Sequence, residues 1–503
     1  LVPNCDYYSK FTVTPALPAW LTLDYVTGVI RGESVQKMDP TPYTITAKKL
    51  DGTDSSKTLT LSIITCDKVM IEVIVLSDYY PNECSWAVYE GESIEGTPIF
   101  ERKELEARNS REYKYFCFDN GVYTFKFADS GGDGWTAPAG FKIQTSKGFP
   151  IAMGSVPATD SKPSVVTRTI STYQMIPTQS PAWKLSKGSA GKNWNSPSFD
   201  DSKWETVTGG GCGTYDGATV YLRHTFEIPD INKFTVLNAA ARFNGGIVGY
   251  LNGQRVYRVN MGTDYDSKTT SEESHPGYSY MEFSIPLQLR GGVTGKNVLA
   301  FEVHPYKSDV ASTDNPFDGF AILGMGDCAL LRNDPSTYEA SNALSGTSAY
   351  GLIDESPFYY LSWDWTEGDY FRLVYENREG VLFNQYRLHT DVNNGEVSWN
   401  AYAKKADGEV YTTFDTAKLV TIPSRSYYAQ KVPNGLMGYN ELRFDFINVL
   451  HPTGFTLTEV ELYYCAYDNS RTCPGVGQYP MTGEGEKSVG PCPDFYDGYS
   501  FRE

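Results

Sequence analysis

The stretch VGYLNGQRVYRV, residues 248–259, carries the pattern that decides the expected fold. Apolar and polar residues alternate on both sides of Asn252-Gly253, and this alternation is typical of β-strands with one buried face. A two-residue loop of Asn and Gly accommodates the positive φ angles that a tight hairpin turn requires. The stretch therefore predicts a β-hairpin.

The same combination of alternating strands and turn residues recurs elsewhere. Residues 43–63, YTITAKKLDGTDSSKTLTLSI, place two alternating segments around Asp51-Gly52. The 503 residues include 37 Tyr, 46 Gly and 28 Pro, a composition that favours strands separated by turns. A chain of this length should divide into several domains. We therefore expect an all-β protein of tandem β-sandwich or jelly-roll domains joined by short linkers.

The charge of the chain argues against two classes of partner. The formal net charge is −18, which opposes binding to phosphate backbones and to anionic lipid surfaces. No apolar run is long enough to cross a bilayer, and no N-terminal segment has the pattern of a signal peptide. We expect no nucleic-acid partner and no membrane insertion within this segment, and a processed chain or a fragment of a longer one.

Two segments at the start of the chain resemble modules of extracellular proteins. Residues 17–32, LPAWLTLDYVTGVIRG, resemble the core pattern of immunoglobulin-like and cadherin-like repeats, which implies a small β-sandwich over residues 1–65. The segments YPNECSWAVYEG and CFDNGVYTFKFADSGGDGW resemble the CUB-like jelly-roll modules of protist and algal surface proteins, which implies a second unit over residues 66–172.

The rest of the chain resembles three further modules. The segments WKLSKGSAGKNWNSPSFDDSKWETV and GKNVLAFEVH resemble galactose-binding-like β-sandwiches and imply a unit over residues 173–335. SNALSGTSAYGLID, FNQYRLHT and TLTEVELYYC resemble a discoidin-like sandwich over residues 336–466. From Arg471 onward the sequence resembles the start of a small disulfide-rich module of the hormone-receptor-like kind, over residues 467–503.

Nine cysteines are spread along the chain, at positions 5, 66, 84, 117, 212, 328, 465, 473 and 492. Their wide spacing does not match the short paired spacings of zinc sites and favours disulfides in an oxidising compartment. The domain boundaries predict three pairs, Cys5 with Cys66, Cys84 with Cys117 and Cys212 with Cys328. Cys465, Cys473 and Cys492 have no unique pairing. The chain should therefore be extracellular or exposed on a cell surface.

The segment ADSGGDGW, residues 128–135, is the strongest candidate for a metal loop. Asp129, Asp133 and Gly134 fit an EF-hand, but Gly131 and Gly140 stand where oxygen ligands are needed, so an EF-hand is excluded. The alternatives are a Gly-rich turn whose Asp side chains cap backbone amides, or a Ca²⁺ site completed by groups from elsewhere. Asp354 lies where discoidin-like domains supply a loop ligand for calcium. No other cofactor is expected.

Catalytic motifs are missing from the sequence. The five histidines, at 224, 275, 304, 389 and 451, show no metal-binding spacing, and GTSAYG at 346–351 is one residue too long for a nucleophile elbow. Paired carboxylates cannot be recognised from sequence alone, but every unit resembles a noncatalytic sandwich. We therefore expect that the chain is not an enzyme.

The set of modules resembles the long surface proteins of flagellated protists and algae, including the protein that builds mastigonemes, the hairs on flagella. This resemblance implies a structural subunit of an extracellular filament or surface coat, in which copies of the chain contact one another. A first alternative is a glycan-binding adhesin that uses the loops of the third and fourth units. A second alternative is an accessory region of a secreted glycosidase. The sequence contains no Asn-x-Ser/Thr sequon, which leaves Ser/Thr-linked glycans for a glycoprotein.

Overall fold

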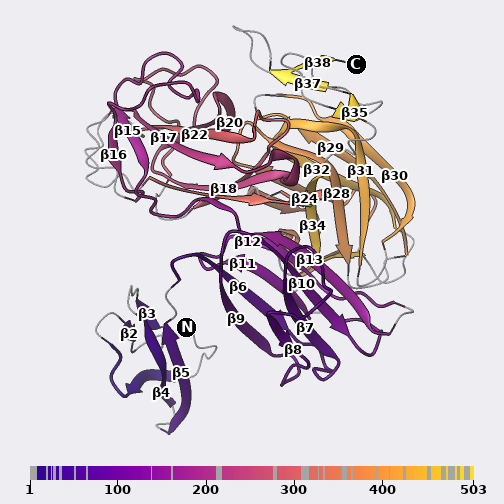
Figure 1. The fold of residues 1–503 in the computed structure, drawn as a ribbon. Coiled ribbons are helices and arrows are strands. Elements are labelled where there is room, and N and C mark those ends of the chain that lie inside the picture. Colours follow the sequence, from indigo (N-terminus) through magenta and orange to yellow (C-terminus); the bar gives the residue numbers. More distant parts are fainter. Residues whose placement is uncertain are drawn as a thin grey trace. The chain divides into compact units, whose positions relative to one another are not determined.

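A computed structural model shows how these segments fold (Figure 1). It describes residues 8–18, 21–23, 25, 30–32, 37–49, 53–63, 66–136, 139–159, 162–210, 218–275, 280–306, 317–326, 328–331, 335–353, 360–363, 366–390, 395–406, 408–422, 426–449, 455–465, 472–473, 482–483, 488–491 and 499–502. Within these ranges the regular structure consists of β-strands and two short 3₁₀ helices, η1 (Ile231–Lys233) and η2 (Ala349–Leu352). The all-β prediction is therefore confirmed.

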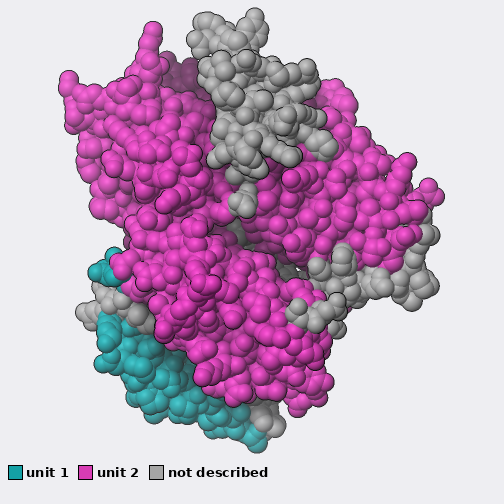
Figure 2. Space-filling model, turned by 45° about the vertical axis from the view of Figure 1, so that its right-hand side comes forward, with its two compact units in different colours: residues 1–69 teal, residues 70–503 magenta. Residues whose placement is uncertain are grey.

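The chain divides into two compact units, residues 1–69 and 70–503, which Figure 2 colours separately. In the first unit, β1 (Tyr8–Thr14), β4 (Met38–Lys49) and β5 (Asp54–Ile63) form an antiparallel sheet, and β2 (Leu21–Leu23) pairs with β3 (Ile30–Gly32). Phe11, Tyr43 and Ala47 are buried in this unit. The hairpin predicted around Asp51-Gly52 is present as β4 and β5, although the two turn residues lie outside the described ranges.

The second unit begins with a sandwich of two four-stranded sheets, in the orders β13-β10-β7-β8 and β12-β11-β6-β9. The strands are β6 (Val69–Leu76), β7 (Cys84–Glu90), β8 (Phe100–Arg102), β9 (Arg111–Phe118), β10 (Val122–Asp129), β11 (Gly140–Thr145), β12 (Pro150–Gly154) and β13 (Ser164–Ser171). The sheets pack through aromatic side chains: the rings of Phe127 and Phe141 stack with their centroids 3.7 Å apart, and Trp86 stacks on Phe127. We call this the second sandwich.

The third sandwich packs a four-stranded sheet, β14-β23-β18-β21, on a six-stranded one, β16-β15-β17-β22-β19-β20. Its strands are β14 (Gln174–Ile176), β15 (Trp183–Lys187), β16 (Glu205–Val207), β17 (Val220–Ile228), β18 (Val236–Arg242), β19 (Gly246–Leu251), β20 (Gln254–Val259), β21 (Met281–Pro286), β22 (Gly295–His304) and β23 (Asp318–Gly324). The hairpin predicted at 248–259 is formed by β19 and β20, and both Asn252 (φ 51°) and Gly253 (φ 90°) take the positive φ that the turn requires.

The fourth sandwich contains the sheets β24-β34-β28-β31 and β25-β27-β32-β29-β30, with β26 paired to β33. Its strands are β24 (Cys328–Leu330), β25 (Pro335–Ala340), β26 (Leu361–Trp363), β27 (Tyr370–Tyr375), β28 (Val381–Thr390), β29 (Glu396–Lys404), β30 (Thr412–Thr421), β31 (Ser426–Tyr439), β32 (Glu441–Val449), β33 (Phe455–Leu457) and β34 (Glu459–Cys465). Trp363 and Trp399 are fully buried in its core. Trp365, which we expect to be buried with Trp363, lies outside the described residues.

The segment expected to begin a disulfide-rich module contains two short strand pairs, β35 (Thr472–Cys473) with β36 (Thr482–Gly483) and β37 (Ser488–Pro491) with β38 (Tyr499–Arg502).

The second, third and fourth sandwiches contact one another through buried side chains. Phe149 of the second sandwich stacks on Phe320 of the third, with ring centroids 4.5 Å apart. Between the third and fourth, Glu379 accepts from Arg255 Nε at 2.7 Å and from Arg258 Nε at 3.0 Å. The three sandwiches therefore form one compact unit rather than a string of independent domains.

Two of the predicted disulfides are wrong. Cys328 bonds Cys465, because β24 pairs with β34 in a register that places these two residues opposite each other. Cys328 thus belongs to the fourth sandwich, and the predicted bond from Cys212 to Cys328 does not form. Cys212 itself lies outside the described ranges.

Cys84 is a free thiol, so the predicted bond from Cys84 to Cys117 is also absent. Cys84 is a buried residue of β7, whereas Cys117 occupies an exposed position of β9, in the opposite sheet. Burial raises the pKa of the Cys84 thiol to about 12. Cys66 and Cys117 are both disulfide-bonded, while Cys5, Cys492 and the side chain of Cys473 are not described.

The Glu379 ion pairs should contribute measurably to stability. Replacing Glu379 by Gln leaves Arg258, whose side chain is 3% exposed, without its charged partner, which should lower the free energy of unfolding by roughly 3 kcal/mol. Glu272→Gln is the matched control, because Glu272 pairs with Arg378 at the surface and should contribute less than about 1 kcal/mol. Urea denaturation of both variants measures the difference, and equal losses would contradict the role given to Glu379.

Candidate functional site

Two places in the second unit gather side chains that could bind a ligand. The first is the acidic loop between β10 and β11. Asp129 is the last residue of β10, and Asp133 lies in the loop that follows. β7 pairs with β10 so that Cys84 stands opposite Asp129, and the Ser130 amide donates to the Glu83 carbonyl at 3.0 Å. This register brings Glu83, which precedes β7, to the two aspartates.

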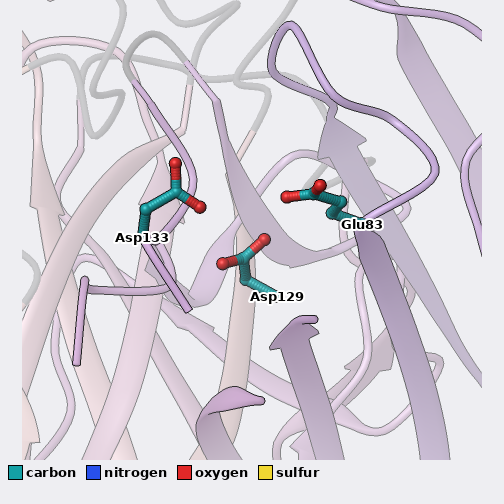
Figure 3. A group of neighbouring side chains, drawn as sticks. All are labelled: Glu83, Asp129 and Asp133. Carbon is teal, nitrogen blue, oxygen red and sulfur yellow. The ribbon is translucent and has the colours of Figure 1, made fainter. Parts of the chain in front are cut away.

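The carboxyl groups of Glu83, Asp129 and Asp133 point toward one another (Figure 3). One oxygen from each lies within 4.8 Å of the others. Asp129 is buried, Glu83 is half-buried and Asp133 is exposed. Gly131 lies between them, because a Cβ atom there would overlap Glu83 Oε2 and approach Asp133 Oδ1 to 2.7 Å. A larger residue at this position would therefore separate the carboxylates.

The side chain of Asp129 caps backbone amides of the loop, which is one of the two alternatives that the sequence leaves open. Its Oδ2 atom accepts hydrogen bonds from the Gly132 amide at 2.7 Å and the Gly134 amide at 3.0 Å. In the described ranges, the carboxylates of Glu83 and Asp133 accept no hydrogen bond and form no ion pair. Three carboxylates at this separation repel one another unless a cation is shared, and Ca²⁺ is bound by oxygen ligands of this kind. The residues fit a calcium ion.

The sequence proposes Asp129 and Asp133 as metal ligands, and the structure places their carboxylates beside that of Glu83, which the sequence does not identify. No short motif links Glu83 to a loop that follows it by more than 40 residues, and only the pairing of β7 with β10 joins them. The third predicted ligand, Asp354, lies outside the described residues.

Calcium should stabilise the protein through this loop. Adding CaCl₂ to metal-free protein should raise the melting temperature, because bound cations stabilise the folded state by mass action. Asp133→Asn should abolish most of this increase because it removes one of the three charged oxygen ligands. The fold should tolerate this change, since Asp133 is exposed and its carboxylate forms no hydrogen bond or ion pair among the described residues. Glu95→Gln, an exposed acid of the same sandwich, should leave the increase intact. Differential scanning calorimetry provides the measurement, and an identical response of both variants would show that calcium binds elsewhere.

The second candidate is a cavity of about 290 Å³ between the second and fourth sandwiches. We call it the interdomain pocket. The second sandwich contributes Trp135, Ala139, Met153, Gly154, Ser155, Pro157, Val166 and Arg168, and the fourth contributes Arg387, His389, Thr390, Tyr427, Thr458, Glu459, Glu461 and Tyr463. Pockets between domains are common ligand sites.

Strand alternation explains the polar wall of the pocket. On β28, Tyr386 and Leu388 point into the core of the fourth sandwich, so Arg387 and His389 point outward. β34 follows the same rule: Val460, Leu462 and Tyr464 are core residues, and the residues between them face the pocket. The antiparallel register sets Arg387 opposite Glu461 and His389 opposite Glu459.

Arg387 is held by stacking rather than by hydrogen bonds. Its guanidinium carbon lies 3.9 Å from the ring centroid of Tyr463 and 4.5 Å from that of Tyr427. These cation-π contacts fix the plane of the group without using its N–H donors. Arg387 Nε is buried and has no hydrogen-bond acceptor among the described residues. Its Nη atoms likewise donate no hydrogen bond in the described part of the chain, so the donors of the guanidinium are unused.

Glu461 is an ionised acceptor next to Arg387. Burial alone would raise the pKa of its carboxyl, but the charge of His389 and hydrogen bonds from His389 and Tyr463 hold that pKa at about 2. His389 Nε2 and the Tyr463 hydroxyl each lie 2.8 Å from Glu461 Oε2. The guanidinium of Arg387, a hydrogen-bond donor, and the carboxylate of Glu461, an acceptor, therefore lie side by side on the wall of the interdomain pocket.

The acidic loop and the pocket are consecutive in the sequence. Trp135, which ends the ADSGGDGW segment, is 1% exposed and lines the pocket, and its backbone amide donates to the Val156 carbonyl at 2.9 Å. The metal candidate and the pocket therefore share one loop.

Sequence reasoning did not find the pocket. The alternation in FNQYRLHT and TLTEVELYYC could have placed Arg387, His389 and Glu461 outward, but it could not show that another sandwich covers them. Tryptophan rings can stack on sugars, but Trp183 and Trp363 are fully buried, and Trp194 and Trp204 are half-buried.

One protein family matches part of the chain. Residues 4–64 match the family described as "Putative Ig domain", which confirms the immunoglobulin-like resemblance of the first sandwich. No curated protein is similar in sequence at a significant level. Among the described residues, no helix is long and apolar enough to cross a membrane.

Several solved structures are similar to about a quarter of the chain. They include the family 32 carbohydrate-binding module of AlyQ in complex with 4,5-unsaturated mannuronic acid (14% identity, 26% of this chain and 95% of that chain, TM-score 0.22) and the family 32 module of Clostridium perfringens NanJ in complex with galactose (14%, 25% and 92%, TM-score 0.22). SpGH29 is 13% identical with a TM-score of 0.22, and the matched region spans 26% of its length.

Proposed function

We propose that this chain is an extracellular glycan-binding protein and that a saccharide binds in the interdomain pocket. The observation that carries this proposal is that Arg387 and Glu461 lie opposite each other on β28 and β34, on the wall of the pocket. The guanidinium of Arg387 donates no hydrogen bond among the described residues, while Glu461, on the neighbouring strand, is an ionised acceptor. Adjacent hydroxyl groups of a sugar ring can donate to a carboxylate and accept from a guanidinium at the same time.

The walls of the pocket match the two faces of a sugar ring. Trp135, Met153 and Val166 supply an apolar wall for C–H groups, while the fourth sandwich supplies the polar wall. Tyr427 is 39% exposed at the rim, where an aromatic ring is accessible to a bound sugar. A volume of about 290 Å³ lies at the small end of ligand pockets, which run from roughly 300 to 1,000 Å³, and suits a short saccharide.

The disulfides support an extracellular location. Cys66, Cys117, Cys328 and Cys465 are all bonded, and such bonds persist mainly in oxidising compartments. The sequence predicts that a glycan would bind at the loops of the third and fourth units. The proposed site differs, because the pocket lies between the second and fourth sandwiches.

A glycan array probed with the full chain tests the proposal. We expect binding to a limited set of saccharides, and Arg387→Ala should weaken the strongest of them about tenfold or more, because hydrogen bonds to a charged group are lost. Arg443→Ala is the matched control: Arg443 also lies over a tyrosine ring, 4.1 Å from the centroid of Tyr370, but it does not line the pocket. Absence of binding across a broad array would refute the proposed function.

One observation favours a second function, a structural subunit of a filament or surface coat such as a flagellar hair. β30 is an edge strand of its sheet and carries Leu419, which is 52% exposed and has a φ of 49°. Such an edge has backbone donors and acceptors that a second copy of the chain can pair with. The other alternative, an accessory region of a secreted glycosidase, requires a catalytic domain elsewhere in the protein.

Electron microscopy of the purified protein tests the structural alternative. Regular fibres that disappear when Lys is placed at Leu419 would support assembly through β30, because a charge on an edge strand opposes pairing. Dispersed single particles at all concentrations would count against a filament and leave the glycan-binding proposal in place.

A further inference from the structure

The interdomain pocket contains two arginines that form no ion pair among the described residues, in a chain whose formal net charge is −18. Arg168 comes from the second sandwich and Arg387 from the fourth. We infer that the pocket recognises an acidic sugar residue, one that carries a carboxylate or a sulfate group. This inference rests on the proposed glycan-binding function and specifies its ligand class.

Arg387 differs from several arginines of the molecule in forming no ion pair among the described residues, although its charge helps to lower the pKa of the Glu461 carboxyl. Arg102, Arg223, Arg372 and Arg443 each place a guanidinium nitrogen within 3.3 Å of a carboxylate oxygen. In the described part of the chain, Arg387 makes neither an ion pair nor a hydrogen bond, although Glu461 faces it across the strands. Glu461 is already bound by His389 and Tyr463.

Arg168 is the second cation without a partner of opposite charge. Its Nη1 donates to the Thr167 carbonyl at 2.9 Å, and its guanidinium lies 5.7 Å from the ring centroid of Phe141. No ion pair involves it in the described ranges. Gly154 leaves space for the group, since a Cβ atom there would lie 3.1 Å from Arg168 Nη2.

The guanidinium groups of Arg168 and Arg387 both line the pocket and lie near the same tyrosine. Both interact electrostatically with the Tyr463 hydroxyl, although they belong to different sandwiches. A planar guanidinium binds a carboxylate or sulfate through two parallel N–H···O bonds, and such charge-assisted bonds are stronger than neutral ones. An anionic group between Arg168 and Arg387 would be attracted by both guanidinium charges.

The acids of the pocket argue for a sugar rather than a simple anion. Glu459 and Glu461 line the same wall and are each 6% exposed. Their carboxylate oxygens accept hydrogen bonds from hydroxyl groups, which a sugar supplies and a simple inorganic anion such as sulfate does not. A ligand that combines one anionic group with several hydroxyls satisfies both sets of residues, and an acidic sugar has this composition.

Isothermal titration calorimetry with the full chain tests the inference. Three probes of equal length are compared: a galacturonate oligomer, a sulfated galactose oligomer and a neutral galactose oligomer. At least one acidic probe should bind about tenfold or more tightly than the neutral one, and its affinity should fall as NaCl increases. Preference for one acidic probe identifies the group as carboxylate or sulfate.

Two substitutions locate the effect. Arg387→Lys keeps the charge but removes the fork of donors, and Arg168→Gln removes one charge; both should weaken the acidic probe about tenfold and leave a neutral sugar less affected. Arg443→Ala should change neither. Unchanged melting temperatures establish that the variants are folded.

The outcomes separate this inference from the proposed function. Equal affinity for acidic and neutral probes would overturn the inference while preserving glycan binding. No binding to any probe, together with a negative array, would overturn both.

Discussion

The structure depends on the burial of a polar sheet face. Side chains alternate along β28 and β34, so one face fills the core of the fourth sandwich and the other presents Arg387, His389, Glu459 and Glu461. In a single sandwich this face would lie in water. Here the second sandwich covers it, and each charged group must find a partner or a ligand, because an unpaired buried charge is costly. Glu461 accepts hydrogen bonds from His389 and Tyr463, whereas Arg387 stacks on two tyrosine rings and forms no ion pair among the described residues.

This constraint connects the two candidate sites. The loop that carries Asp129 and Asp133 ends at Trp135, which forms part of the pocket wall. Asp129 holds the start of the loop by accepting from the Gly132 and Gly134 amides. Whatever fixes the acidic loop therefore also fixes the position of Trp135. A calcium ion shared by Glu83, Asp129 and Asp133 would serve the pocket by limiting the movement of its apolar wall.

Local features could be predicted from the sequence, and contacts between distant segments could not. The β19–β20 hairpin follows from Asn252-Gly253, because the turn chemistry is contained in two residues. Asp129 and Asp133 belong to one short loop, so the sequence alone places them together. Glu83 joins them only through the register of β7 and β10. The bond between Cys328 and Cys465 could not be predicted because the two residues are 137 positions apart in the sequence. Only the pairing of the short strand β24 with β34 places Cys328 in the fourth sandwich. Cys84 failed to pair because strand alternation directs it into the core.

The central claim is that a saccharide binds between the second and fourth sandwiches, and a crystal structure of the full chain with an acidic oligosaccharide tests it most directly. The account predicts that the anionic group of the sugar lies between Arg168 and Arg387, with a hydroxyl on Glu461 and a ring face against Trp135. A sugar bound at the loops of the third sandwich, with the interdomain pocket filled by water, would contradict the account.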